Sequence, residues 1–108
     1  MPLQKRFEVN YELFAESLKR YSETDRRTIA AYFAIIALTR KTRKISNGVI
    51  QAELTYWEKF SIQVVLDALR IHIKKYAGKT EGYTRGIMRS RHKEGETKLG
   101  IIREHGGS

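Results

Sequence analysis

The sequence contains no cysteine and only one proline, at position 2. Without cysteine the chain has neither disulfides nor thiolate ligands for zinc, which suits a reducing cytoplasm. Its longest uninterrupted apolar run, residues 29–38, has ten members, whereas a membrane-spanning helix needs roughly 20. The basic N-terminus is followed by the acidic and polar residues 8–16 rather than by the apolar centre of an export signal. We therefore expect a cytoplasmic protein with no membrane partner.

Glycine is also scarce over most of the chain. Residues 3–77 include one glycine, at position 48, and such a shortage of breakers favours helices over strands and turns. The length of 108 residues and the apolar content of 41% suit one hydrophobic core. We expect an all-α fold, a single compact bundle of about five helices in residues 1–95. Residues 96–108 are expected to form a tail that is partly disordered.

Two signals predict five helices: apolar residues at helical spacing, and N-cap residues before them. They are expected at residues 11–21, 23–39, 47–59, 62–76 and 81–93, after the caps Asn10, Ser22, Ser46, Ser61 and Thr80. The second helix is apolar around nearly its whole circumference, which is typical of a helix surrounded by others. Trp57 is expected in the core. In the last helix we expect Tyr83, Ile87 and Met88 to point inward and Arg85 to point outward, with a close helix contact at Gly86.

Charge is distributed unevenly along the chain. The net charge is +9. Residues 1–39 hold six Lys/Arg against five Asp/Glu, a balance of +1, and residues 40–108 hold fifteen against seven, a balance of +8. Clustered cations release condensed counterions when they meet phosphates. The asymmetry therefore favours a polyanionic partner bound by the second half of the chain. The alternative is that the positive charge only keeps the domain soluble.

Three groups of cations are the candidate nucleic-acid-binding residues. They follow the second helix, end the fourth helix and lie along the fifth: Arg40, Lys41, Arg43 and Lys44; Lys74, Lys75 and Lys79; Arg85, Arg89, Arg91 and Lys93. The first group is compatible with either a solvated connector or a phosphate grip. Tyr76 and Tyr83 lie among these cations and either stack on bases or belong to the core, as their helical register favours.

Signatures of catalysis are missing. No glycine-rich loop is followed by the lysine and hydroxyl of a phosphate cradle, and the histidines at 72, 92 and 105 lack the spacing of a metal-binding helix. His72 is expected at the edge of a helix face. Ser61 and Asp67 share a helix with that histidine, and the serine is explained as its cap. We predict no catalytic residues, metal or cofactor, and no enzymatic activity.

The segment 46–95 carries a more specific pattern. Trp57 precedes the cap Ser61, an amphipathic helix ends in basic residues, and Tyr83 and Ile87 are spaced four apart. This segment resembles the C-terminal domain of the DnaD-like replication-initiation proteins, which show a tyrosine, an isoleucine and a tryptophan at spacings of four. Arg91 occupies the position of that tryptophan. The exchange gives up stacking on a base and gains charge for phosphates.

The resemblance implies an all-helical module that binds DNA in replication. Together with the groups of cations, it predicts a sequence-tolerant DNA-binding accessory of replication or DNA transfer in a bacterial, phage or mobile-element system. Its partners would be single- or double-stranded DNA and a replicative helicase, its loader or another replication protein. One alternative is a helix-turn-helix regulator that reads DNA with residues 62–76. Another is an interaction module whose cations meet an acidic protein. Self-association and strand preference stay open at this point.

Overall fold

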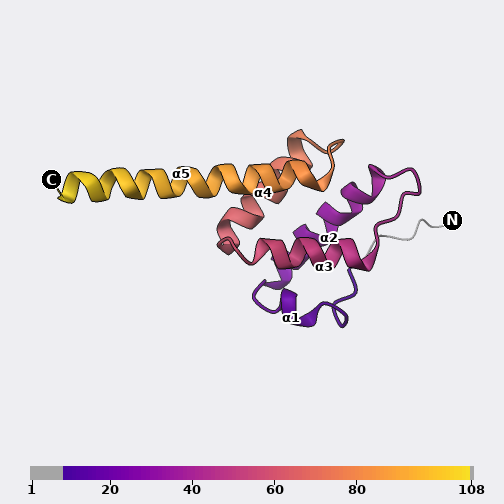
Figure 1. Cartoon of the computed structure of the whole chain (residues 1–108). Coiled ribbons are helices and arrows are strands. Elements are labelled where there is room, and N and C mark those ends of the chain that lie inside the picture. The colour runs from indigo at the N-terminus through magenta and orange to yellow at the C-terminus, as the bar shows by residue number, and fades with distance from the viewer. Residues whose placement is uncertain (1–8, 108) are drawn as a thin grey trace.

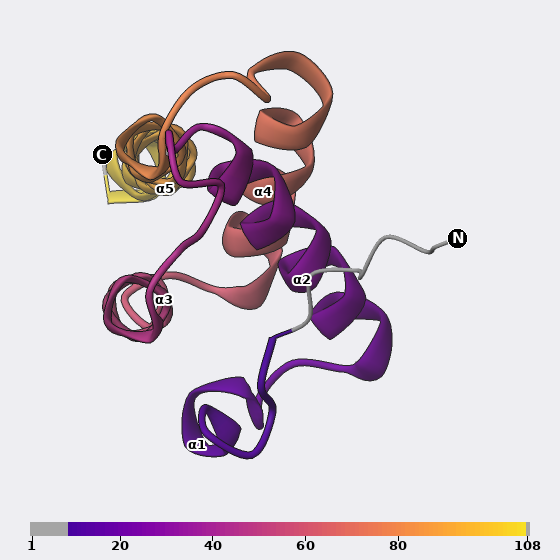
Figure 2. The ribbon, with the colours of Figure 1, turned by 90° about the vertical axis from the view of Figure 1, so that its right-hand side faces the viewer.

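A computed structural model describes the backbone of residues 9–107 and the side chains of residues 9–94. The described backbone forms five helices and no strand: α1 (Ala15–Leu18), α2 (Glu23–Leu38), α3 (Asn47–Trp57), α4 (Ile62–Lys75) and α5 (Glu81–Gly107). α4 packs against both α2 and α5, and α1 packs against α3 (Figure 1 and Figure 2). The predicted all-α bundle is therefore confirmed.

Serine side chains start the three central helices, as the sequence predicts. Ser22 and Asp25 form a reciprocal capping box, with the Asp25 amide donating to Ser22 Oγ at 3.0 Å and the Ser22 amide to Asp25 Oδ2 at 3.3 Å. Ser46 and Ser61 each accept from the amide three residues ahead at 3.2 Å. Each cap satisfies an amide that has no partner within its own helix. These local bonds fix where α2, α3 and α4 begin.

The core is built on a cluster of rings between α2 and α3. The Trp57 ring stacks on Phe33 at a centroid distance of 5.4 Å and meets Tyr32 edge-on at 5.7 Å. All three side chains have no exposed surface. Aliphatic side chains of α4, among them Val65 and Leu69, are equally buried and complete the cluster. The predicted core position of Trp57 is therefore confirmed.

Two expectations for the N-terminal helices are wrong. The first helix is a single turn, Ala15–Leu18, rather than a helix over residues 11–21. Asn10 instead closes a turn, because its side chain accepts from the Leu13 amide at 3.1 Å. Tyr11 is 42% exposed. α2 is not covered on all sides either, since Leu38 lies in its last turn and is 60% exposed.

The last helix is longer than expected. α5 continues to Gly107 instead of ending near Lys93, and its 27 residues span about 40 Å at about 1.5 Å per residue. Its C-terminal half extends beyond the other helices, so the molecule measures 65 × 28 × 22 Å (Figure 1). The partial disorder expected for residues 96–108 stays a prediction, since the side chains of residues 95–107 and all of Ser108 lie outside the described part.

The buried face of α5 differs by one residue from the expected one. Met88 is fully buried as predicted, and Thr84 joins it. Tyr83 is 42% exposed, so its expected inward position is wrong, whereas Ile87 is half-buried and packs against the core as expected. The fully buried positions are therefore Thr84 and Met88, with Ile87 half-buried beside them and Tyr83 on a more exposed face.

Gly86 faces open space rather than a neighbouring helix. A Cβ atom built there would meet only the Arg89 side chain, at 3.8 Å, so the expected close helix contact is wrong. Gly86→Ala should therefore raise the free energy of unfolding by about 0.5–1 kcal/mol, because alanine restricts the unfolded chain and favours the helix. Urea unfolding followed by circular dichroism measures this change. A loss of stability would show that another surface approaches this glycine closely.

Candidate nucleic-acid interface

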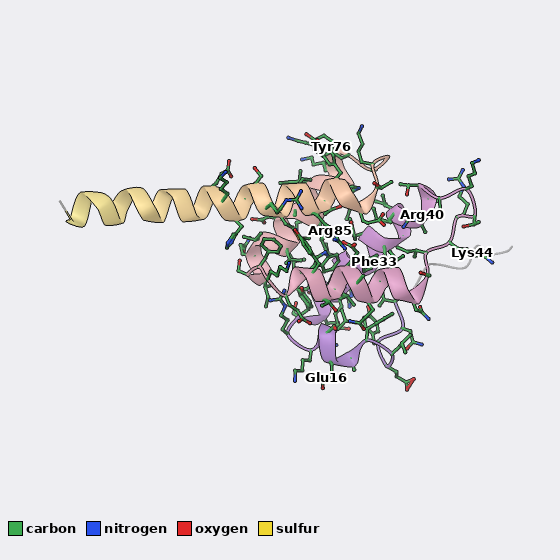
Figure 3. All side chains as sticks on the ribbon, in the orientation of Figure 1. Glu16, Phe33, Arg40, Lys44, Tyr76 and Arg85 are labelled. Carbon is green, nitrogen blue, oxygen red and sulfur yellow. The ribbon has the colours of Figure 1, made fainter. Side chains whose placement is uncertain are left out.

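Arg85, expected on the outer face, is half-buried and held by a carboxylate. Its guanidinium donates to both oxygens of Glu53, from Nε at 3.0 and 3.1 Å and from Nη2 at 2.5 Å. It also lies 4.4 Å from the centre of the Tyr56 ring, while Glu53 is 2% exposed. The hydrogen bonds to Glu53 raise the pKa of Arg85, which keeps this guanidinium charged. Arg85 of α5 thus uses its Nε and Nη2 donors to hold Glu53 of α3, and its side chain lies between these two helices (Figure 3).

Arg40 is paired in a similar way at the other end of the bundle. Its two terminal nitrogens each donate to one oxygen of Glu81 at 2.8 Å. The Arg40 guanidinium holds the pKa of the Glu81 carboxyl below its ordinary value through these bonds. This bidentate pair links the segment after α2 to the first turn of α5. It brings the basic residues 40–44 beside the start of α5, as the two ribbon views agree (Figure 1 and Figure 2).

The remaining arginines of the predicted set are more exposed and more weakly held. Arg91 approaches Asp67 at 3.4 Å, with 42% of its side chain exposed. Arg89 donates to the Tyr56 hydroxyl at 3.1 Å. Arg43 donates to the Leu38 carbonyl at 2.7 Å, and its φ of 60° places its backbone in the left-handed region that often follows a helix. Exposed contacts of this kind contribute little stability, so a ligand can replace them at low cost.

The predicted lysines form the least engaged group. All of them are exposed, and within residues 9–94 none lies within 4 Å of a carboxylate oxygen: Lys41, Lys44, Lys74, Lys75, Lys79 and Lys93. Lys74 and Lys75 end α4, and Lys79 follows in the short connection to α5. Three of these charges thus lie within six residues at one end of the α4–α5 pair. No carboxylate in the described part of the chain neutralises them.

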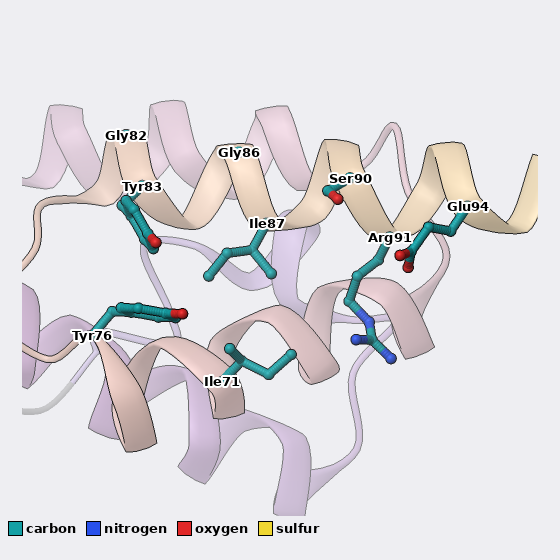
Figure 4. A pocket seen from close by; sticks show the side chains of 9 residues that line it. All are labelled: Ile71, Tyr76, Gly82, Tyr83, Gly86, Ile87, Ser90, Arg91 and Glu94. Atoms are coloured by element: carbon teal, nitrogen blue, oxygen red, sulfur yellow. The ribbon is translucent and has the colours of Figure 1, made fainter.

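A groove of about 510 Å³ runs between α4 and α5 next to these lysines. Its lining comes from both helices and the connection: Ile71, Tyr76, Gly82, Tyr83, Gly86, Ile87, Ser90, Arg91 and Glu94. Figure 4 shows the Tyr76 and Tyr83 rings facing each other at one end of the groove and the Arg91 guanidinium at the other. The two ring centres are 4.6 Å apart, and Lys79 Nζ lies 6.0 Å from the centre of the Tyr83 ring. The groove therefore joins aromatic surface to positive charge.

The groove collects residues that the sequence placed apart. Tyr83, Ile87 and Arg91, spaced four apart, share one face of α5 and line it together. Ile71 and Gly82 were not singled out in the sequence, because neither carries a charge or a ring. Glu53 also went unnoticed, although it follows Ile50 and precedes Trp57 in the buried register of α3, where a carboxylate needs a partner.

Other chemistry is not evident in the described part of the chain. No group of three histidine or acidic side chains there is arranged to hold a metal ion. None of the described helices is both long enough and apolar enough to cross a membrane. Comparison of the sequence and structure with protein-family models, curated proteins and solved structures finds no match. The resemblance of residues 46–95 to the DnaD-like domain therefore stays a prediction.

Proposed function

We propose that this protein binds DNA with little sequence preference through the lysines at the α4–α5 connection. The observation that carries the proposal is the exposed group Lys74, Lys75 and Lys79, which no described carboxylate pairs, beside the Tyr76 and Tyr83 rings. Phosphates are attracted to such unpaired cations, and exposed rings offer stacking surface to bases of any sequence.

Residues 89–93 of α5 and the segment after α2 extend this surface. Arg89, Arg91 and Lys93 lie further along α5, and Lys41, Arg43 and Lys44 follow Arg40, which is bonded to Glu81 in the first turn of α5. Arg40 and Arg85 are assigned to the framework instead, because Glu81 and Glu53 occupy their guanidinium groups. A role as an accessory of replication or DNA transfer rests only on the resemblance to DnaD-like proteins.

A helix-turn-helix regulator has less support. Its recognition helix would be α4, which is covered by α2 on one side and by α5 on another. The polar residues in its N-terminal half are Gln63 and Asp67, and they are bonded to each other at 2.9 Å. Asp67 also meets Arg91. A carboxylate facing the DNA backbone is unfavourable, so base reading by this helix fits the observed contacts less well.

The test is replacement of the three lysines. The variant Lys74→Ala/Lys75→Ala/Lys79→Ala should bind DNA more weakly, because each lysine that meets a phosphate releases about one counterion. Fluorescence anisotropy over a salt series gives both affinity and salt dependence. We expect the logarithmic salt slope to fall in magnitude by about 2–3 for two unrelated sequences, each offered as a single strand and as a duplex.

A charge-matched variant provides the control. Lys19→Ala/Arg27→Ala/Lys59→Ala removes the same net charge at exposed positions in other parts of the molecule, and it should keep most of the affinity. Equal losses of DNA affinity in the two variants would show that only net charge matters, and would reject the lysines at the α4–α5 connection as the binding surface. If the native protein binds neither strand form at low salt, the DNA proposal fails and an acidic protein partner becomes the better explanation.

A further inference from the structure

A chain of buried hydrogen bonds crosses the core beneath the groove. The Tyr32 hydroxyl of α2 lies 2.6 Å from Thr84 Oγ1 of α5, and that oxygen lies 2.9 Å from His72 Nδ1 of α4. The other ring nitrogen of His72, Nε2, lies 3.0 Å from the carbonyl oxygen of Lys79 in the connection. None of the three side chains has exposed surface. His72 was expected at the edge of a helix face, and this expectation is wrong. It lies seven residues, or about two helical turns, after the buried Val65 and shares its face.

The direction of all three hydrogen bonds follows from the acceptor at the end of the chain, the Lys79 carbonyl oxygen. The Lys79 carbonyl oxygen accepts only, so His72 Nε2 must carry a proton and donate it. In a neutral ring Nδ1 then accepts, and the Thr84 hydroxyl supplies that proton. The Tyr32 hydroxyl in turn donates to Thr84. Burial raises the pKa of Tyr32, which keeps this hydroxyl protonated. Every donor in the chain is satisfied in this arrangement.

Protonation of His72 reverses this order and leaves one donor without an acceptor. Nδ1 would then donate to Thr84, and of the two hydroxyl protons of Thr84 and Tyr32 only one would still have an acceptor among the described residues. A buried donor without a partner costs about 1–3 kcal/mol. The added charge is buried as well, which is a further cost.

No neighbouring group compensates for that charge. The rings of Tyr32 and Tyr83 face His72 edge-on at centroid distances of 5.4 and 6.3 Å. The acidic groups that flank this region are Glu81 of α5 and Glu53 of α3, and each is paired with an arginine. No described carboxylate oxygen lies within 4 Å of either His72 ring nitrogen. The ring is therefore held neutral.

We propose that Tyr32, Thr84 and His72 form a pH-sensitive lock on the α4–α5 connection. The neutral ring ties the Lys79 carbonyl to α4 and fixes Thr84 of α5, which together set the path of residues 76–80. At acidic pH the protonated ring favours an open connection, in which His72 reaches water. In the open state Tyr76 moves away from Tyr83, and one end of the groove is lost. This lock is independent of what the groove binds.

The sign of the pH dependence follows from the burial. Burial lowers the pKa of His72 below its ordinary value, and the bond to the Lys79 carbonyl opposes this only in part. The folded protein thus binds the proton less well than the open state does. The lock is fully closed above about pH 7.5, and it weakens as the pH falls through the ordinary histidine value of about 6.5.

Amide hydrogen exchange tests the proposal on the native protein. The amides of Tyr76, Lys79 and Tyr83, bonded at 2.8–3.0 Å in and beside the connection, should lose protection by up to about tenfold per pH unit below pH 6.5 after correction for intrinsic exchange. Their exchange should depend little on low denaturant, because the opening is local. The amide of Val65, bonded to Ser61 at the start of α4, should exchange by global unfolding with steep denaturant dependence.

Two further measurements keep the result decisive. In His92→Gln/His105→Gln the only histidine is His72, and nitrogen NMR should show the Nε2–H tautomer at pH 7.5 and protonation below the ordinary pKa. His72→Gln keeps a donor and an acceptor without titrating, and it should abolish the pH dependence of protection at the connection. Protonation of His72 at or above pH 6.5 in the folded protein, or an unchanged pH profile in His72→Gln, would overturn the proposal.

Discussion

Arg85→Met should lower the free energy of unfolding by about 3 kcal/mol, because it leaves the carboxylate of Glu53 buried without its cation. Glu53 is 2% exposed and its two oxygens receive all three hydrogen bonds from Arg85. Methionine preserves much of the packing volume over the Tyr56 ring, so the loss reports mainly on the charge. Urea unfolding followed by circular dichroism measures the change.

The double variant Glu53→Leu/Arg85→Met separates an unpaired charge from lost packing. Replacing both members of a buried ion pair by apolar groups is often nearly neutral, so this variant should recover most of the lost stability. Lys74→Met provides the surface comparison, and it should change stability by less than about 0.5 kcal/mol. If the Arg85→Met protein is as stable as the native one but no longer binds DNA, Arg85 belongs to the DNA-binding surface instead.

The arginines show why the candidate site was only partly predictable. Arg40, Arg85 and Arg91 meet their carboxylates 41, 32 and 24 residues away along the chain. Such pairs depend on how helices cross, and no spacing within one helix reveals them. The lysines at 74, 75 and 79 were easier to place, because a cation at a helix end with no local acidic neighbour stays exposed by default.

The fold shows the same division between local and distant causes. The starts of α2, α3 and α4 were predicted, since each cap bonds an amide three residues ahead. The buried face of α5 was misjudged by one residue, because apolar Tyr83 was expected inside, whereas it is 42% exposed and its neighbour Thr84 is buried with Met88. The polar side chain of Thr84 is satisfied inside the fold, because it finds hydrogen-bond partners on α2 and α4.

The position of His72 had a signal that was read incorrectly. It lies three residues after Leu69 and seven after Val65, within the buried stripe of α4. A polar ring at such a position needs two partners, and it finds them in Thr84 and the Lys79 carbonyl. The connection between α4 and α5 thus depends on a side chain whose role becomes visible only when three helices are assembled.

Trp57→Ala should lower the free energy of unfolding by about 3–5 kcal/mol, the range for deletion of a large buried ring. Trp57 has no exposed surface, stacks on Phe33 with an interplanar angle of 12° and meets Tyr32 edge-on. It also ends α3, where its carbonyl accepts from Arg20 at 2.8 Å. Removing the ring opens a cavity between α2 and α3 that rigid neighbours fill only in part. Far-ultraviolet circular dichroism follows this transition without tryptophan fluorescence.

Trp57→Phe distinguishes the cavity from the loss of ring contacts. Phenylalanine keeps a ring against Phe33 and removes the indole N–H, which is buried and has no hydrogen-bond partner among the described residues. Relief of that unpaired donor offsets part of the smaller volume, so Trp57→Phe should lose less than half as much stability as Trp57→Ala. Equal losses in the two variants would mean that the fit of the whole indole, rather than ring stacking, stabilises the junction of α2 and α3.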